Sequence, residues 1–341
     1  MNDDLVVAVD GGNSKTDLAL VRGTGEVLAL VRGPQSSPHY LGIDGSLGVL
    51  DRLLDEAVER AGVADGHGPV ARVAQLLMAG VDFPSEEEEL ERAATARGRF
   101  AERVAVGNDT FAVLRSGTAK GWGVAVVCGT GINCLGIGPD GRHSRFPALG
   151  TLTGDWGGGT DVGLAAVYAA ARSEDGRGPK TVLEQAVPAH FGLETPMELA
   201  EAVHRGRVEF ESAADLAPVV LDVAPHDPVA AEILDRLAAE IVALVRVSLQ
   251  RLDLLGEQVD VLLGGGLFLS GSTILATAVE DRLAEVAPRA SARVADSPPV
   301  VGAALLGLDA LTAGADAQAR LRRELGNAFA QKMENGRGNR G

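Results

Sequence analysis

The chain has 341 residues, 46% of them hydrophobic and 23% charged, and its formal net charge is −16 at pH 7. This length and composition predict two globular α/β domains and exclude a disordered chain. The negative charge argues against non-specific binding of nucleic acid or anionic lipid, so a bound phosphate would need local donors or a metal ion.

The beginning of the sequence carries no apolar signal segment, and no apolar run is long enough to span a membrane. We therefore expect a cytoplasmic protein.

Cys128 and Cys134 flank one predicted turn. Two thiols make no disulfide framework, and a metal or redox site normally needs more ligands than two.

The first motif lies between two apolar runs, 5–9 and 18–21, which predict a β-hairpin. Its turn is glycine-rich, and adjacent glycines let backbone N–H groups approach an anion, while hydroxyls and a lysine add donors. The aspartate that opens the turn would repel a bare phosphate and so implies a bridging cation, most simply Mg²⁺. An ordinary solvated turn is the alternative. The residues concerned are Asp10, Gly11, Gly12, Asn13, Ser14, Lys15 and Thr16.

The next elements predict the first domain, residues 1–118. Three strands occupy 5–31, and the breaker-rich stretch 33–40 is expected to be a loop. A helix capped by Asp44 follows, then a strand over 73–80, a helix from about Ser85, a strand over 103–107 and a helix through 112–114. This βββαβα order with a mixed sheet fits a ribonuclease-H-like domain better than a Rossmann domain.

The beginning of this pattern recurs 118 residues later, from Gly11 to Gly129. The apolar run 122–128 leads into Gly129, Thr130 and Gly131, and then into the apolar run 132–137. Such self-similarity predicts two related domains, whose loops would face each other across a cleft and hold a nucleoside triphosphate from both sides. We expect the second domain to span 119–312, with a helical insertion at about 171–255, and to be followed by a polar tail, 313–341, that forms a loose helix and then disorder.

Four further positions are candidates for chemistry or binding. Asp109 follows a predicted strand and is placed either to accept a proton from a substrate hydroxyl or to cap the next helix. Asp155 is a candidate for a sugar hydroxyl or a metal-bound water, or is a turn residue. The run Gly264, Gly265 and Gly266 follows a strand and would admit adenine beside bare backbone, or form a simple helix entry. His39 lies in a polar stretch and is either within reach of substrate or a surface residue.

Two common alternatives are excluded by motif. The sequence contains neither a Gly-x-Ser-x-Gly nucleophile elbow nor a Gly-x-x-x-x-Gly-Lys-[Ser/Thr] loop. A nucleotide would therefore be held by the paired hairpins.

Six motifs in order resemble the BadF/BadG/BcrA/BcrD ATPase family, and within it the N-acetylglucosamine-kinase-like branch of the actin/hexokinase/sugar-kinase superfold. The resemblance covers about residues 5–311 and rests on 10–16, 108–109, 129–133, 154–159, 263–266 and 298–304. It implies two ribonuclease-H-like domains, ATP and Mg²⁺ as cofactors, a small-molecule sugar as substrate, and often a homodimer.

The resemblance also implies roles for single residues. The first hairpin, 10–16, would bind phosphate, with Asp10 near Mg²⁺ and Thr16 near the terminal phosphates. The second phosphate loop would be 129–131, and the adenosine motif would be 264–266. Asp109 would be the base that activates the sugar 6-hydroxyl. The helices after Asp109 and after Pro299 would connect the domains, and closure would exclude water. The substrate-binding set would be Ser37, His39, Asn108, Asp109, Asn133, Gly150 and Asp155.

The sequence departs from the family where it would contact the sugar. The usual Gly-Trp-Gly is Ala148-Leu149-Gly150 here, the usual Gly-Asp-Glu-Gly is Gly154-Asp155-Trp156-Gly157, and Ser36, Ser37 and His39 stand in a loop that tends to carry Asn. The catalytic residues therefore match those of the family, but the sequence does not identify the sugar. N-acetylglucosamine leads, and glucosamine, N-acetylmannosamine and N-acetylmuramic acid are alternatives.

Two other functions are alternatives to the kinase. A sister branch of the family activates acyl-CoA dehydratases through an iron–sulfur cluster shared between subunits, but two thiols on one hairpin do not match the expected separation. A non-catalytic regulator that binds sugar or nucleotide is disfavoured because neither end carries a basic helix-turn-helix segment.

Overall fold

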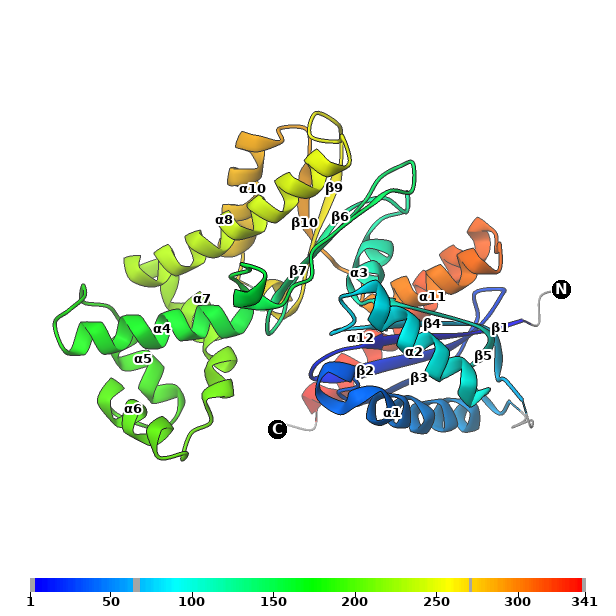
Figure 1. Ribbon diagram of the computed structural model, residues 1–341, viewed down its shortest axis with the longest axis horizontal. Helices are drawn as coiled ribbons and strands as arrows, with labels where there is room; N and C mark the ends of the chain where they lie inside the picture. Colours follow the sequence, from blue (N-terminus) through cyan, green and yellow to red (C-terminus); the bar gives the residue numbers. More distant parts are fainter. Residues whose placement is uncertain (1–3, 64–67, 270–271, 339–341) are drawn as a thin grey trace. The chain divides into compact units, whose positions relative to one another are not determined.

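The computed structural model describes residues 4–63, 68–269 and 272–338. The chain forms two compact units (Figure 1): unit 1 contains 1–121 and 295–341, and unit 2 contains 122–294. Residues 295–312 thus pack with the first unit, whereas the sequence placed them in the second domain. The reason is a long-range contact: Gly307 packs so closely on Val6 that an added Cβ would lie 2.2 Å from Val6 Cγ1.

Unit 1 is built around a five-stranded sheet in the order β3-β2-β1-β4-β5. The β1, β2 and β3 strands are antiparallel, and β4 and β5 run parallel to β1. The predicted strands and helices are all present, and written out in full their order is βββαβαβα. The elements are β1 Leu5–Gly11, β2 Lys15–Arg22, β3 Val27–Pro34, α1 Pro38–Ala61, β4 Ala71–Met78, α2 Pro84–Arg97, β5 Ala101–Asn108, α3 Thr110–Gly117, α11 Pro299–Ala310 and α12 Ala315–Gly338.

Both faces of this sheet are buried, because its central strands are apolar at nearly every position. Val7, Val9 and their neighbours pack against α1 and α2, while Val6 and Ala8 on the opposite face pack against α11 and α12. Unit 1 is therefore a three-layer α/β/α structure.

The stretch 33–40 is not the loop that its proline and glycine content predicts. The β3 strand extends to Pro34, and α1 already begins at Pro38, because proline suits the first turn of a helix. The helix bends at Gly42 (φ 65°, ψ 171°). Asp44 is consequently not a cap: its side chain is fully exposed and lies 3.3 Å from Arg97 Nη2.

Unit 2 repeats the topology with the order β8-β7-β6-β9-β10, so the predicted duplication is confirmed at the level of the fold. Helices inserted between β8 and β9 are the main difference; Thr195 and Asp227 cap two of them by accepting the N–H of Glu198 and Ala230. The elements are β6 Gly123–Cys128, β7 Ile132–Ile137, β8 His143–Arg145, α4 Gly158–Glu174, α5 Leu183–His190, α6 Pro196–His204, α7 Ala217–Val223, α8 Pro228–Arg251, β9 Asp260–Gly264, α9 Gly266–Leu269, α10 Ile274–Val286 and β10 Ser291–Val294, with 3-10 turns at Gly150–Leu152, Phe210–Leu216 and Ala224–His226.

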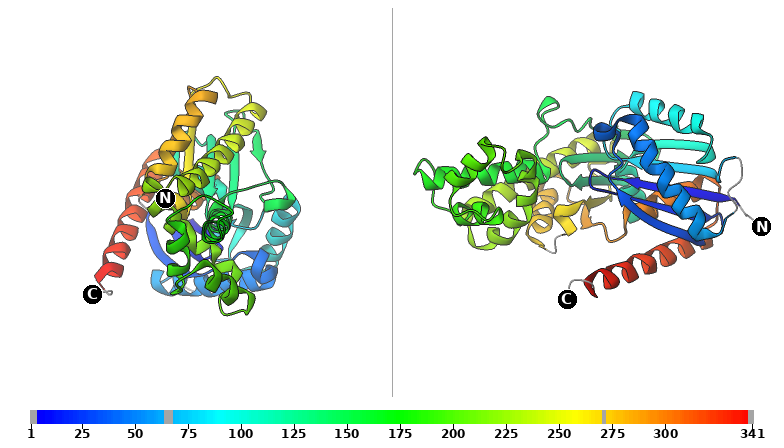
Figure 2. Two further views of the ribbon diagram at one scale, coloured as in Figure 1. Left: turned by 90° about the vertical axis from the view of Figure 1, so that its left-hand side faces the viewer. Right: turned by 90° about the horizontal axis from the view of Figure 1, so that it is seen from below.

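The polar tail forms one long helix, α12, which Figure 2 shows in red along the sheet of unit 1. The disorder expected beyond it concerns residues 339–341, which lie outside the described residues. In the described parts of the chain, every helix is too short or too polar to cross a bilayer.

Candidate functional site

The first hairpin forms as predicted and ends at the pair Gly11–Thr16. The N–H of Gly12 donates to the Lys15 carbonyl at 2.9 Å, and Asn13, Ser14 and Lys15 are exposed. Thr16, in contrast, is fully buried, and its hydroxyl donates to the Pro34 carbonyl at 2.7 Å. The exposed turn is thus the part of the motif that can meet a ligand, while the Thr16 side chain ties β2 to β3.

Asp10, the last residue but one of β1, lies directly opposite Asp17 on β2. Asp17 is neutralised by Arg32, which donates to both carboxylate oxygens at 2.7 Å. Asp10 has no such partner: burial, followed by repulsion from Asp109 and Asp17, raises its pKa from 3.8 to about 8. A cation beside Asp10 would relieve this repulsion.

Asn108 and Asp109, at the end of β5, have different roles. The Asn108 side chain accepts the N–H of Thr110 at 3.0 Å and donates to the Val81 carbonyl at 3.1 Å. Asn108 therefore makes the capping contact at the start of α3, which was one of the two roles predicted for Asp109. The Asp109 side chain itself makes no capping hydrogen bond.

Asp109 keeps part of its surface exposed and has an altered acidity. Burial raises its pKa from 3.8 to about 6, and the backbone N–H groups of Thr110 and of Asp109 itself oppose part of that rise. A carboxyl group with a pKa near neutrality is a stronger base than an ordinary aspartate and is still ionised at pH 7.

Ser37 and His39 lie where α1 begins, beside the turn that follows β4. An added Cβ on Gly80 would lie 2.6 Å from Ser37 Oγ and 2.9 Å from His39 Cβ, so this close approach requires glycine. The Ser37 hydroxyl is buried without a hydrogen-bond partner in the described structure, and the His39 side chain is exposed. An unpaired buried hydroxyl is uncommon in native proteins.

In unit 2 three glycine motifs meet. Gly265 (φ 95°) follows β9 and lies so near the end of β6 that a Cβ would be 2.2 Å from the Cys128 carbonyl oxygen. Gly159 donates its N–H to the Gly129 carbonyl at 2.7 Å, and a Cβ on Gly158 would lie 2.4 Å from the carbonyl oxygen of Gly131. The structure therefore joins the predicted loops 129–131 and 264–266 to residues 157–159. These last three glycines were not among the predicted site residues, although a run of glycines indicates close backbone packing.

Of the remaining predicted residues of unit 2, Gly150 and Asp155 lie in one turn, and Asn133 lies on β7. Asp155 donates its N–H to the Gly150 carbonyl at 3.0 Å, and its carboxylate accepts the Thr153 hydroxyl. Asn133, on β7, accepts the N–H of Cys134 at 2.7 Å. Trp156 follows Asp155 and stacks under Arg236, whose guanidinium carbon is 3.9 Å from the ring centre.

The two thiols are unsuited to binding a cluster. Cys128 and Cys134 are both buried in the core of unit 2; burial raises the pKa of Cys134 to about 12 and that of Cys128 still further. Within the described ranges, no group of three or more His, Cys, Asp or Glu side chains is arranged to hold a metal ion.

Several known proteins are similar to this chain over most of its length. The chain is 26% identical to N-acetyl-D-glucosamine kinase of Dictyostelium discoideum over 316 residues, which are 91% of this chain and 99% of the relative. It is 28% identical to N-acetylmuramic acid/N-acetylglucosamine kinase of Clostridium acetobutylicum over 262 residues, 76% of this chain and 84% of the relative. Among solved structures, a Chromobacterium violaceum protein described as a "Putative N-acetylglucosamine Kinase" superposes with a TM-score of 0.70 at 24% identity, covering 89% of this chain and 99% of that one.

That likeness, together with the two sheets of equal topology, shows that the chain has the same two-unit α/β fold as that structure. The family model of the BadF/BadG/BcrA/BcrD ATPases matches residues 7–307, which is most of the sequence. The chain belongs to the BadF/BadG/BcrA/BcrD ATPase family.

Proposed function

We propose that this protein is an ATP-dependent kinase that transfers the γ-phosphate to a hydroxyl group, the 6-hydroxyl by expectation, of an amino sugar. Two curated relatives that match most of the chain are named as kinases of N-acetylated amino sugars. The observation that carries the proposal is Asp109, a partly exposed carboxyl at the carboxyl end of β5 whose pKa is raised to about 6. Ligands of α/β sheets bind at such strand ends.

In this proposal unit 1 supplies the base and the metal ligand. Asp109 accepts the hydroxyl proton as the sugar oxygen attacks the γ-phosphorus, and the bond to the β-phosphate oxygen breaks. Asp10 fits Mg²⁺, because this ion is usually held by one or two carboxylates together with phosphates and waters. Bound Mg²⁺ would neutralise charge on the phosphates. The turn residues 11–15, of which Asn13, Ser14 and Lys15 are exposed, would contact the phosphates, and the buried Thr16 side chain would hold the base of that turn.

Unit 2 supplies glycine loops for the nucleotide. An added Cβ on Gly129, Gly131 or Gly266 would meet no atom within 4 Å, so the backbone at these positions is open to a ligand. We assign Gly129, Thr130 and Gly131 to phosphate, and Gly264, Gly265 and Gly266 to adenosine. Gly265 is needed to bring the second loop against the first.

The sugar-contacting set is proposed as Ser37, His39, Asn108, Asn133, Gly150 and Asp155. N-acetylglucosamine is the leading substrate. The neighbouring Leu152 side chain is 88% exposed, an apolar group that would favour an acetamido methyl over a charged amine. We further propose that the protein acts as a homodimer in the cytoplasm.

The test is ADP release with Mg²⁺ and ATP across a panel of glucose, glucosamine, N-acetylglucosamine, N-acetylmannosamine and N-acetylmuramic acid. We expect N-acetylglucosamine to give the highest kcat/KM and its 6-phosphate to be the product by NMR. The absence of sugar-dependent ADP release from a folded protein that binds ATP would refute the kinase. A different best sugar would refute only the assignment of N-acetylglucosamine.

A further inference from the structure

The C-terminal helix α12 lies beyond residue 307, where the family match ends, and yet is firmly docked on unit 1. Leu321 and Leu325 are fully buried in the cluster formed with α11 and the sheet. The Glu324 carboxylate accepts the backbone N–H of Val27 on β3 at 2.8 Å and is itself held by Arg320 at 2.6 Å. A helix that covers an edge strand and satisfies its backbone is a built part of the domain.

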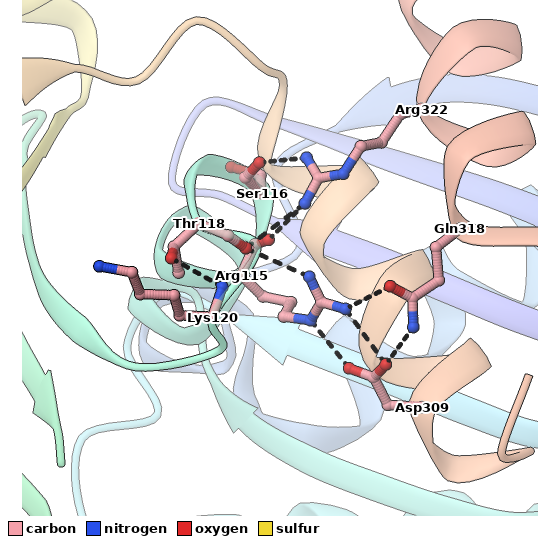
Figure 3. Close-up of polar contacts among 7 residues, drawn as sticks. All are labelled: Arg115, Ser116, Thr118, Lys120, Asp309, Gln318 and Arg322. Atoms are coloured by element: carbon pink, nitrogen blue, oxygen red, sulfur yellow. Dashed lines mark hydrogen bonds and ion pairs between the residues drawn. The ribbon is translucent and has the colours of Figure 1, made fainter. Parts of the chain in front are cut away.

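Arg322 of α12 binds the end of α3 (Figure 3). Its guanidinium donates to the carbonyl of Ser116, to that of Arg115 at 3.2 Å and to that of Thr118 at 3.4 Å. The last carbonyls of a helix have no partner within the helix, and a cation there also matches the helix dipole. Arg322 therefore fixes the carboxyl end of α3.

A second group of contacts joins α3, α11 and α12 at the same place. The nearly buried Arg115 donates to both carboxylate oxygens of Asp309 on α11, at 2.8 and 3.1 Å, and to Gln318 Oε1 on α12 at 3.0 Å. Gln318 closes the ring by donating to Asp309 Oδ1 at 2.8 Å. Every polar atom in this group is paired, which makes such a network rigid.

The other end of α3 carries the proposed base. The Asp109 carbonyl accepts the N–H groups of Ala112 at 3.0 Å and Val113 at 3.3 Å, so Asp109 belongs to the first turn of α3. The helix has only eight residues and packs on α11 so closely that a Cβ on Gly302 would lie 1.9 Å from the Ala112 carbonyl oxygen. A two-turn helix does not absorb a displacement at its far end, and it would pass such a displacement to Asp109.

The helix α12 also contacts Arg32, which pairs with the neighbour of the second carboxylate, Asp10. The Arg32 guanidinium carbon lies 5.6 Å from the ring centre of Phe329 on α12, and Arg32 holds the Asp17 carboxylate that faces Asp10 across the hairpin. The same helix thus contacts the supports of both acidic residues.

We propose that α12 positions the catalytic carboxyl groups of unit 1, with Arg322 as the positioning residue that holds α3, and so Asp109, in register with the substrate. The proposal rests on the role given to Asp109 in the proposed kinase reaction. It goes further in assigning a part in catalysis to a segment outside the family match.

The test compares Arg322→Ala and Arg322→Lys with Arg323→Ala, which removes an exposed arginine from the next position of the same helix. We expect Arg322→Ala to lower kcat by about tenfold or more at a temperature well below its melting point, with the KM values for ATP and sugar within about twofold of the wild type. Lysine can donate to one carbonyl but cannot span all three, so Arg322→Lys should recover part of kcat. Arg323→Ala should match the wild type.

Amide hydrogen exchange of residues 110–117 gives a readout independent of the reaction. Arg322→Ala should speed exchange there, and Arg323→Ala should not. If Arg322→Ala lowers only the melting temperature and leaves kcat and the exchange of α3 unchanged, the proposal is overturned. If the wild type transfers no phosphate, the kinase assignment fails. In that case, unchanged hydrogen exchange of α3 in Arg322→Ala would separately refute the claim that Arg322 holds α3.

Discussion

The sharpest test of the active site is Asp109→Asn, which keeps the size of the side chain and removes its ability to take a proton. General-base catalysis contributes about 10²- to 10⁴-fold to a rate, so kcat should fall by that range. The pKa of about 6 makes a second prediction for the wild type. The ionised form is the active one, so about 90% of the enzyme is active at pH 7 and about 10% at pH 5, and kcat/KM should fall about tenfold per pH unit below 6.

The assay is ADP release with the best sugar of the panel between pH 5 and 8, with ATP binding measured by calorimetry. Asp44→Asn, a fully exposed carboxylate in the same unit, is the matched control and should retain wild-type activity. We expect Asp109→Asn to bind ATP normally. A variant that keeps kcat within tenfold of the wild type, or a wild-type profile that is flat from pH 5 to 7, would refute the assignment of Asp109 as the base.

Three further outcomes follow from the same structure. The pKa of Asp10 is raised to about 8, so the stability contributed by its neutral form is fully present below pH 3.8 and is lost as the pH rises through about 8. Asp10→Asn should therefore stabilise the ligand-free protein by about 1–3 kcal/mol at pH 8 and by little at pH 4, and equal melting temperatures at pH 8 would contradict this. Gly302→Ala should destabilise the protein by about 3 kcal/mol in urea denaturation. Gly326→Ala, with open space around its Cβ, is the control and should be neutral or stabilising. Equal urea midpoints for the two variants would show that α3 and α11 can separate without loss of stability. The thiols of Cys128 and Cys134 should react with a thiol reagent only after unfolding, and the purified protein should be colourless and free of iron; rapid labelling of the native protein would reopen the cluster alternative.

The elements with strong local patterns were predictable from sequence. Both glycine hairpins and the repeated strand order are features in which turn chemistry and hydrophobic periodicity agree. The stretch 33–40 was mispredicted because proline and glycine content indicates a break without saying how short it is. The break is three residues long, 35–37, and proline then begins a helix.

Long-range packing was not predictable from these patterns. Nothing local to residues 299–310 says that the helix packs on β1 and not on the strand just before it. Likewise, position alone left Asp109 as either a cap or a base. The choice between cap and base depends on Asn108, whose side-chain oxygen accepts the N–H of Thr110. The amide of Asn108 is held in place by the carbonyl of Val81, which lies 27 residues earlier.

The division of the chain has a consequence for its synthesis. Unit 2 is one continuous segment, 122–294, and is complete as soon as its last strand leaves the ribosome. Unit 1 must wait, because the helix that covers Val6 and Ala8 is translated only after residue 298. The first strands made are therefore left with one apolar face bare during most of translation, and this interval is when the nascent chain most needs a chaperone.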